Sequence, residues 1–390
     1  MLHTLYKNYP KTFPLPLVLD GSTGTSLMRE GMPSGSCTEK WVLEHPDVLR
    51  KIQRGYINSG SDALYAPTFG ANRPTLERSD ITDVPEINER LAALTVGSGV
   101  LTGGDMSPTG LFIEPFGDTP FDEVVAAYRE QAEALDKAGV DFFISETNIS
   151  LNEARAAVIG IREVSDKPIF VTMTVDDSGR TLSGDDLVCC LLTLAELGIS
   201  AFGTNCSQGP DGMLGLLKTL VPYSLSLGIP LIAKPNAGLP HEDEQGQRHF
   251  DLDADSFAKY VPEFLDAGIP ILGGCCGTDS EFISKIRAAV DAAVPDYSRV
   301  TPVDTSNLAC NNRIVCDGVD LGAAVKVKEC FFDDVCMEEH IVFAELEDMA
   351  AADIFIETAP MLSVPCAVTG DAAAIDKARR DYNGKLLVIR

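Results

Sequence analysis

The sequence predicts an α/β protein, a (β/α)8 TIM barrel with a small C-terminal α/β appendage, on three observations. Five helical stretches end at a glycine and are followed, after one or two residues, by an apolar run; the glycines are Gly60, Gly139, Gly198, Gly228 and Gly268. Glycine suits the left-handed conformation that ends a helix. The runs are apolar almost throughout, as expected of parallel strands buried on both faces. Eight strand and helix pairs in about 290 residues fit the size of such a barrel.

The expected strands follow one another at intervals that leave room for a helix. They cover residues 16–22, 61–67, 100–105, 140–147, 168–175, 199–206, 229–236 and 269–276. Helical patterns between and after them cover residues 121–139, 151–164, 185–198, 253–268 and 279–293. The competing architecture is a doubly wound sheet, which lacks support because no G-x-G-x-x-G follows the first strand.

Polar residues gather where the expected strands end, and this is the face on which TIM barrels carry their chemistry. In chain order the strand ends are Asp20-Gly21-Ser22, Thr68-Phe69-Gly70, Asp105, Glu146-Thr147, Thr174, Asn205-Cys206, Pro235-Asn236 and Gly274-Cys275-Cys276-Gly277. The barrel would therefore bring three cysteines from distant parts of the chain to one rim.

Cys206, Cys275 and Cys276 form the candidate metal site. Soft thiolates favour zinc, and three protein ligands leave a fourth position open, as in catalytic sites. Adjacent residues of a strand point to opposite faces, so Cys275 and Cys276 can share a metal only if the chain leaves β geometry there. The flanking glycines permit this. The alternative is that the three are small buried core residues, as we expect for Cys189-Cys190 in the middle of a helix.

The charge balance and the cysteine count restrict the partners and the cellular setting. With 58 acidic and 31 basic residues, the formal net charge is -27, which argues against binding to nucleic acid or an anionic membrane. No stretch approaches the roughly 18 to 20 apolar residues that span a bilayer, and the N-terminus does not resemble a signal peptide. Eleven cysteines, an odd number, favour reduced thiols in a cytoplasmic protein.

Several segments together resemble the homocysteine S-methyltransferase family. They are LVLDGSTGTSLMREG, PTFGANR, GDMSPTG, DFFISETNISLNEARAAV, GTNCSQGP, KPNAGLP and GGCCGTD. The likeness runs from about residue 15 to 295 and is greatest to the homocysteine-binding barrel of cobalamin-dependent methionine synthase; enzymes that use betaine or S-methylmethionine are more distant. Pro67 and Thr204 depart from the common pattern, which affects pocket detail and leaves the cysteines in place.

The resemblance implies that Cys206, Cys275 and Cys276 bind Zn(II), with the homocysteine sulfur as the fourth ligand. A free thiol has a pKa of about 8.5, so it is mostly protonated at neutral pH, and only the thiolate is a good nucleophile. Zinc coordination would remove that proton.

The resemblance also implies a substrate pocket. Backbone amides around Asp20, Gly21 and Ser22 would receive the homocysteine carboxylate, Glu146 would bind its ammonium, and Asn236 is a candidate resting ligand or pocket wall. Backbone donors suit an anion and a carboxylate suits a cation. From the residues alone, Asp20 could equally be a turn or N-cap residue. Glu146 could instead pair with a neighbouring helix.

The predicted barrel domain covers residues 1–298, and residues 299–390 are predicted to form a small α/β domain. In this domain we expect helices at 337–351 and 371–382 and strands at 353–359, 364–370 and 385–389. Its last part faintly resembles a piece of the pterin-binding barrel that follows the homocysteine barrel in methionine synthase, so it is interpreted as a reduced remnant. About 90 residues are too few for a second barrel.

The predicted activity is zinc-dependent methyl transfer to homocysteine to form methionine. No corrinoid-binding D-x-H-x-x-G is present, so the donor would come from outside. A separate methyl-corrinoid protein carrying methylcobalamin is favoured, with corrinoid or pterin-binding subunits as partners. Two alternatives remain: direct transfer from S-methylmethionine or betaine, and a noncatalytic zinc or thiol-binding module of a methyltransferase complex.

Overall fold

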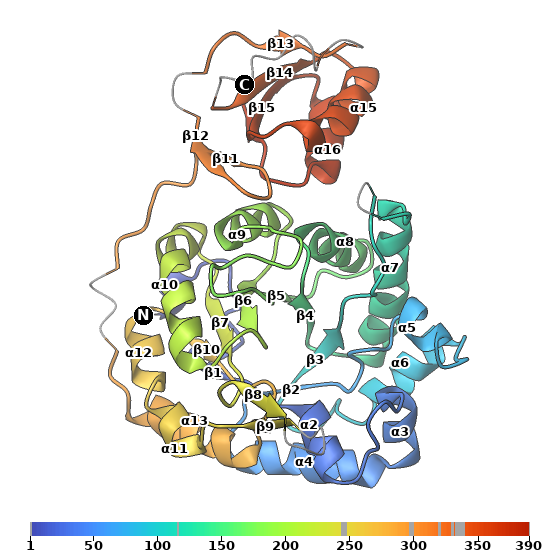
Figure 1. Cartoon of the computed structure of the whole chain (residues 1–390), viewed down its shortest axis with the longest axis vertical. Helices are drawn as coiled ribbons and strands as arrows, with labels where there is room; N and C mark the ends of the chain where they lie inside the picture. The colour runs from blue at the N-terminus through green and yellow to red at the C-terminus, as the bar shows by residue number, and fades with distance from the viewer. Residues whose placement is uncertain are drawn as a thin grey trace.

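Eight parallel strands form the barrel that the sequence predicts. The computed structural model describes residues 2–114, 117–242, 248–295, 300–318, 321–328, 331 and 340–389. The barrel strands are β1 (Leu17–Val18), β2 (Ala63–Tyr65), β3 (Leu101–Met106), β4 (Phe142–Asn148), β5 (Ile169–Met173), β6 (Ala201–Asn205), β7 (Leu231–Lys234) and β10 (Ile271–Leu272). Their order is β1-β10-β7-β6-β5-β4-β3-β2 (Figure 1). All eight predicted strands are therefore confirmed.

The first and second strands complete the ring through contacts of Asp62. Its backbone N–H donates to the carbonyl of Val18 at 2.7 Å, and its carboxylate accepts the N–H of Val18 at 2.8 Å. These bonds join β1 to the segment that leads into β2. The barrel is thus nearly closed, with the segment before β2 completing the gap between β1 and β2.

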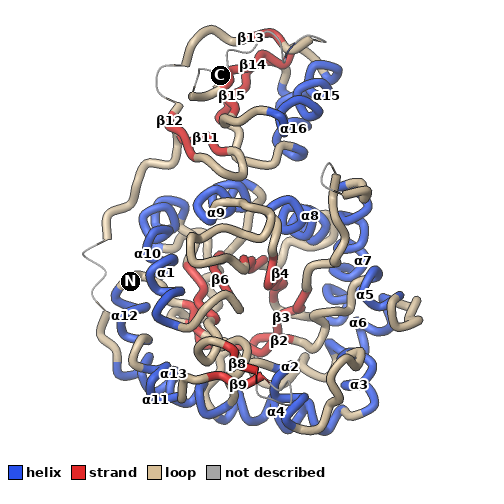
Figure 2. Tube along the Cα trace, in the orientation of Figure 1, coloured by secondary structure: helices blue, strands red, loops and turns tan. Residues whose placement is uncertain are grey.

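Helices surround the strands on the outside, as Figure 2 shows. They are α1 (Leu2–Leu5), α2 (Thr23–Arg29), α3 (Thr38–Glu44), α4 (Pro46–Asn58), α5 (Arg73–Glu77), α6 (Val84–Ala92), α7 (Phe121–Ala138), α8 (Leu151–Arg162), α9 (Leu187–Glu196), α10 (Pro210–Leu227), α11 (Ala254–Ala258), α12 (Val261–Asp266) and α13 (Ser280–Ala292). Gly139 and Gly228 end α7 and α10 in left-handed conformations, with φ of 89° and 66°. A short hairpin, β8 (Pro240–Glu242) and β9 (Arg248–Phe250), follows β7.

The single helix predicted for residues 253–268 is wrong, because two helices, α11 and α12, occupy this segment. Pro262 lies in the first turn of α12. A proline lacks the backbone N–H and restricts the residue before it, so it suits a helix start better than a helix interior.

The barrel interior is apolar at one end and polar at the other. Phe142 and Ile144 of β4 belong to an inner apolar cluster, and Glu146 follows on the same face of the strand. Ile232 of β7 belongs to the same cluster, and Lys234 follows it in the same way. Side chains alternate between the two faces of a strand. Along β4 and β7 the inward-facing residues therefore change from apolar at one end of the barrel to charged at the other.

The C-terminal residues form a second, smaller sheet. Four parallel strands, β13 (Val325–Lys326), β14 (Val342–Leu346), β15 (Cys366–Gly370) and β16 (Leu387–Val388), are accompanied by α15 (Met349–Thr358), a 3-10 turn (Ala359–Met361) and α16 (Ala372–Asp381). An antiparallel hairpin, β11 (Leu308–Cys310) and β12 (Val315–Asp317), precedes them. The predicted domain boundary between residues 298 and 299 lies outside the described residues.

Two predictions in this C-terminal segment are wrong and three are confirmed. The helix predicted for 337–351 is replaced by β14, whose residues alternate between buried and half-buried; residues 337–339 of that prediction lie outside the described part of the chain. The strand predicted for 353–359 is instead part of α15. Short apolar runs do not distinguish a strand from a buried helix. The strand at 364–370, the helix at 371–382 and the strand at 385–389 correspond to β15, α16 and β16.

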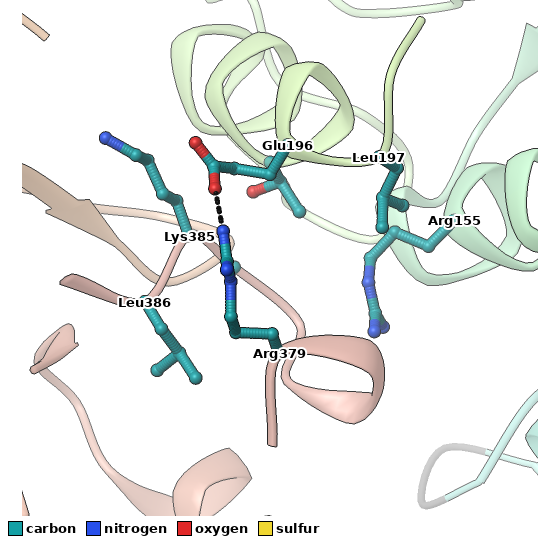
Figure 3. A pocket seen from close by; sticks show the side chains of 8 residues that line it. Arg155, Glu196, Leu197, Arg379, Lys385 and Leu386 are labelled. Atoms are coloured by element: carbon teal, nitrogen blue, oxygen red, sulfur yellow. Dashed lines mark hydrogen bonds and ion pairs between the residues drawn. The ribbon is translucent and has the colours of Figure 1, made fainter. Parts of the chain in front are cut away.

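Hydrogen bonds and an ion pair made by charged residues connect the second sheet to helices on the outside of the barrel. Arg155 of α8 is fully buried and donates to the Asn152 side chain at 2.8 Å and to the backbone carbonyl of Arg380. Arg379 donates to Glu196 of α9 at 2.6 Å, and both line a small pocket with Arg155 (Figure 3). Burial lowers the pKa of Arg155 to about 10, so the guanidinium stays charged at neutral pH. The junction is thus polar and specific.

Replacing Arg155 with methionine is expected to destabilise the protein by about 1 to 3 kcal/mol, because it removes a buried guanidinium and leaves two half-buried acceptors, the Arg380 carbonyl and the Asn152 amide oxygen, without this donor. The midpoint of urea unfolding measures this. Arg129→Met is the matched control: Arg129 is exposed and pairs with Glu163 at 3.3 Å, so its loss should change stability by less than about 1 kcal/mol. Equal effects of the two substitutions would contradict the proposed importance of the junction.

Among the described residues, no helix is long and apolar enough to cross a membrane.

Candidate metal centre and substrate pocket

Three cysteine sulfurs meet at the mouth of the barrel. The Sγ atoms of Cys206, Cys275 and Cys276 all lie within 4.8 Å of one another, and those of Cys206 and Cys276 are 3.3 Å apart. Each side chain is half-buried. Cys206 follows β6, and the other two follow β10, so the barrel brings together residues from two strands separated by β7. By contrast, Cys190 is buried in the middle of α9, as expected of a core residue.

Unusual backbone geometry lets these three side chains converge. β10 ends at Leu272, so Cys275 and Cys276 lie beyond the regular strand, where they need not point to opposite faces. Cys206 adopts a left-handed conformation with φ of 57°, which is rare for a residue other than glycine. Gly277 has φ of 86° and continues the turn. The local strain is concentrated where the sulfurs meet, as is common at functional sites.

Asn205 connects the cysteines to an irregularity in β4. The β4–β5 register shifts between Ser145 and Asn148, and Thr147 has φ of 63°, an outlier for a β-branched residue. The Asn205 amide donates to the Thr147 hydroxyl and accepts the Thr147 N–H, both at 2.9 Å. Its Nδ2 also lies 3.9 Å from the Cys275 sulfur. A bulge of this kind can turn a side chain toward a site.

The donor set fits a zinc ion. Hydrogen bonding to the thiols of Cys275 and Cys276, together with burial and the nearness of their charges, raises the pKa of the Cys206 thiol well above its ordinary value. A cation held by the three sulfurs would favour their thiolate forms. Zinc prefers sulfur ligands, and a three-cysteine set leaves one position for a substrate sulfur.

Lys234 and Asp20 form a buried ion pair beneath the cysteines, and the sequence interpretation missed the lysine. The Lys234 ammonium lies 3.2 Å from Asp20 Oδ1 and 3.7 Å from the centre of the Tyr65 ring. The other oxygen of Asp20 accepts the backbone N–H of Tyr65 at 2.8 Å. Asp20 is therefore neither a turn residue nor an N-cap. A lysine at the end of an otherwise apolar buried strand was the signal available in the sequence.

Glu146 lies in the same pocket. Its Oε2 atom is 3.8 Å from the Lys234 ammonium, which comes from inside the barrel and not from a neighbouring helix. That oxygen has no hydrogen-bond partner among the described residues. Burial raises the pKa of Glu146 to about 7, although Lys234 opposes the shift. A buried acceptor without a partner is costly and indicates a place for an incoming donor.

Gly21 and Ser22 lie where β1 gives way to α2. Ser22 is the N-cap of α2 and accepts the N–H of Thr25 at 3.3 Å, and its own N–H donates to the Thr278 hydroxyl at 3.3 Å. A Cβ atom at Gly21 would lie 2.9 Å from Tyr56 Cε1, so the close packing here requires glycine. The segment holds its amides beside the turn that carries Cys275 and Cys276.

Asn236 lies directly beside the cysteines. Its side-chain amide donates to the carbonyl of Cys206 at 3.3 Å, and its backbone N–H donates to Gln208. The Oδ1 atom is buried and has no partner among the described residues. The structure thus places every predicted site residue around one mouth, and it adds Lys234 to the set.

Comparisons with known proteins identify the family of this chain. A family model described as homocysteine S-methyltransferase matches residues 17–290. The methionine synthases of Mycobacterium leprae and Mycobacterium tuberculosis are 32% and 31% identical over 309 and 298 residues, which are 73% and 70% of this chain and 25% and 24% of those proteins. This chain therefore spans about a quarter of the length of these relatives.

The fold also matches solved structures. The homocysteine methyltransferase MmuM from Escherichia coli superposes with a TM-score of 0.59 in its oxidised form and 0.57 in its metallated form, each at 20% identity and covering 70% of this chain and 95% of that one. At this identity the likeness shows the fold alone. With the family model matching most of its length, this chain belongs to the homocysteine S-methyltransferase family.

Proposed function

We propose that this protein transfers a methyl group to the thiol of homocysteine, forming methionine, at a zinc ion held by Cys206, Cys275 and Cys276. The convergence of the three sulfurs above a buried acidic pocket carries the proposal. When bound, zinc would keep the substrate sulfur as a thiolate at neutral pH. The sulfur lone pair forms the new bond to the methyl carbon, and the donor leaves with the electrons of its former bond to that carbon.

The chain's own residues would bind and orient the amino acid. Glu146 Oε2 has no hydrogen-bond partner among the residues that the structure describes, and it would accept an N–H bond from the substrate ammonium. The amides around Asp20, Gly21 and Ser22 would receive the carboxylate, with the Ser22 N–H giving up its bond to the Thr278 hydroxyl, and Asn236 would line the wall beside Cys206. Fixing both ends of the substrate holds its sulfur in place, which is how positioning lowers a barrier. A noncatalytic zinc module would have no need of these buried polar groups.

Exposed apolar side chains on the rim support a methyl donor carried by a separate corrinoid protein. Phe112, Leu182 and Leu239 lie on the segments that follow β3, β5 and β7, and they are 72%, 81% and 58% exposed. All three segments follow strands at the same end of the barrel, where a partner protein would cover them. Free betaine or S-methylmethionine would not need such a rim.

The assay of donors tests the proposed reaction directly. Zinc-loaded protein is incubated with homocysteine and, separately, with methylcobalamin, a methylated corrinoid protein, S-methylmethionine or betaine, and methionine is measured. Formation of methionine with the corrinoid donors is expected. Product only from betaine or S-methylmethionine would overturn the proposed donor, and no product from any donor would overturn the proposed reaction.

The substitution Leu182→Asp is expected to slow transfer from a methylated corrinoid protein by about 10-fold or more while leaving transfer from free methylcobalamin unchanged, because a charge on the rim opposes burial of the interface. Val294→Asp is the matched control, since Val294 is 95% exposed but follows α13, at the opposite end of the barrel. Equal slowing with both donors would count against docking at the rim.

We also propose that residues 299–390 form a separate domain that helps to recognise a corrinoid or pterin-binding partner. Its support is the polar junction through Arg155, Arg379 and Glu196, which holds the second sheet against α8 and α9. A protein that holds two binding surfaces in a constant relative position can bind one partner through both surfaces at once.

A further inference from the structure

Asp105 is a buried carboxylate that the proposed mechanism does not use. It lies near the end of β3, on the same inward face as Gly103, and is only 6% exposed. Its Oδ1 atom has no hydrogen-bond partner among the described residues. A buried carboxylate oxygen without a donor loses its hydration and gains nothing in return, so a native protein tolerates it chiefly where function requires it.

The backbone of Asp105 is held firmly by a neighbouring side chain. Its N–H donates to the Thr68 hydroxyl at 3.1 Å, and the same hydroxyl donates to its carbonyl at 2.8 Å. Thr68 is in turn fixed by Gln131, whose amide donates to the Thr68 carbonyl at 2.8 Å. The main chain around Asp105 is thus fully bonded while its carboxylate is left available.

The charges in the pocket do not balance. Three buried acids, Asp20, Asp105 and Glu146, share the mouth with one lysine. Lys234 is nearest to Asp20, at 3.2 Å, and it lies 3.8 Å from Glu146 Oε2. Asp20 is already hydrogen-bonded by Lys234 and by the Tyr65 N–H, whereas Asp105 Oδ1 and Glu146 Oε2 have no hydrogen-bond partner within the described part of the chain, and Glu146 Oε2 has only the longer ion pair with Lys234.

The carboxyl groups of Asp105 and Glu146 are close enough to affect each other's ionisation. Asp105 lies opposite Ile144 in the β3–β4 pairing, and Glu146 is the next inward-facing residue along β4. Burial, followed by the nearby Glu146 charge, raises the pKa of Asp105 well above its ordinary value. A cation placed between the two carboxylates would relieve both the missing hydrogen bonds and the repulsion.

We propose that Asp105 and Glu146 together receive the ammonium of the substrate, so that Asp105 is a second determinant of specificity for an amino-acid thiol. This inference rests on the proposed function. An ammonium has three N–H donors and needs more than one acceptor when it is buried. Lys234 is a positioning residue in this arrangement, because it holds Asp20 away from the ammonium.

The test compares thiols that differ by one group. Binding of homocysteine, of 4-mercaptobutanoate, which lacks the ammonium, and of 3-aminopropane-1-thiol, which lacks the carboxylate, is measured by calorimetry on the zinc-loaded full chain. Asp105→Asn is expected to weaken the binding of homocysteine and of 3-aminopropane-1-thiol by about 10- to 100-fold. The binding of 4-mercaptobutanoate should weaken by less than about 2-fold. Asp141→Asn is the control, since Asp141 accepts the Thr102 N–H at the opposite end of the barrel.

Each outcome decides the inference. Equal weakening of all three thiols, or no weakening of any, would overturn the role of Asp105 while leaving the proposed function in place. Failure of the unmodified protein to bind homocysteine would overturn the proposed function and this inference with it. Zinc content and the unfolding midpoint report whether the Asp105→Asn protein folds. If that protein does not fold, Asp105→Ser, which leaves room for a water molecule, allows the same comparison of the three thiols.

Discussion

Replacing Cys275 with alanine is expected to abolish zinc binding and methyl transfer to a thiol together. The Cys275 sulfur belongs to the group of three within 4.8 Å, and removing it leaves two ligands for an ion that prefers four. Changes to groups that only support a metal ligand commonly cost 10- to 100-fold in affinity or activity, so loss of a ligand itself should cost more than about 100-fold. Zinc per chain is measured by elemental analysis, and methionine formation is followed with a corrinoid donor.

Cys190→Ala is the control for this substitution. Cys190 is a buried thiol in α9 and belongs to the core that packs between helices and sheet, so its replacement should leave zinc content unchanged. The expected cost is about 1 kcal/mol of stability from the small cavity. A Cys275→Ala protein that kept full activity without zinc would rule out the proposed metal site.

Replacing Glu146 with glutamine is expected to weaken homocysteine binding by about 10- to 100-fold, because the substrate ammonium loses its anionic partner. Binding of 4-mercaptobutanoate, which has no ammonium, should change little. The ratio of the two affinities isolates the ammonium contact from any change at the metal. Equal weakening of both thiols would contradict the assignment of Glu146.

The same residue predicts a pH dependence with a definite sign. Burial raises the pKa of Glu146 to about 7, so the carboxylate is largely protonated at pH 6 and largely ionised at pH 8. The affinity for homocysteine, relative to 4-mercaptobutanoate, should therefore rise between pH 6 and pH 8, and the rise should be absent in Glu146→Gln. A ratio that does not depend on pH in the unmodified protein would show that Glu146 does not carry the ammonium.

The contribution of Glu146 to protein stability should fall as the pH rises, opposite to the affinity for homocysteine. A folded pKa above the ordinary value of 4.5 means that Glu146 favours the folded state at low pH, and that this contribution is lost as the pH rises through about 7. At pH 8, Glu146→Gln should therefore increase the free energy of unfolding, by up to about 3 kcal/mol. Urea unfolding at pH 5 and pH 8 measures the difference. Such a gain in stability would show that the buried Glu146 carboxylate destabilises the folded protein, and that it is retained because it binds the substrate.

Strand patterns predicted the barrel well because its constraints are local and repetitive. Each buried parallel strand is a short apolar run, and glycines such as Gly139 and Gly228 mark the helix ends that precede them. The C-terminal segment was harder. Residues 342–346 and 353–359 are both short and apolar, and only their packing made one a strand and the other part of a helix.

By itself, the sequence determined the fold class, the family and the rim on which Cys206, Cys275 and Cys276 lie, because the ends of parallel barrel strands all reach the same face. Only the tertiary structure decided which charged groups meet inside that rim. The pairing of Lys234 with Asp20, and the approach of Asp105 to Glu146, depend on how neighbouring strands are staggered as the sheet closes. Distances across the interior follow from that closure, and no spacing along the chain encodes them.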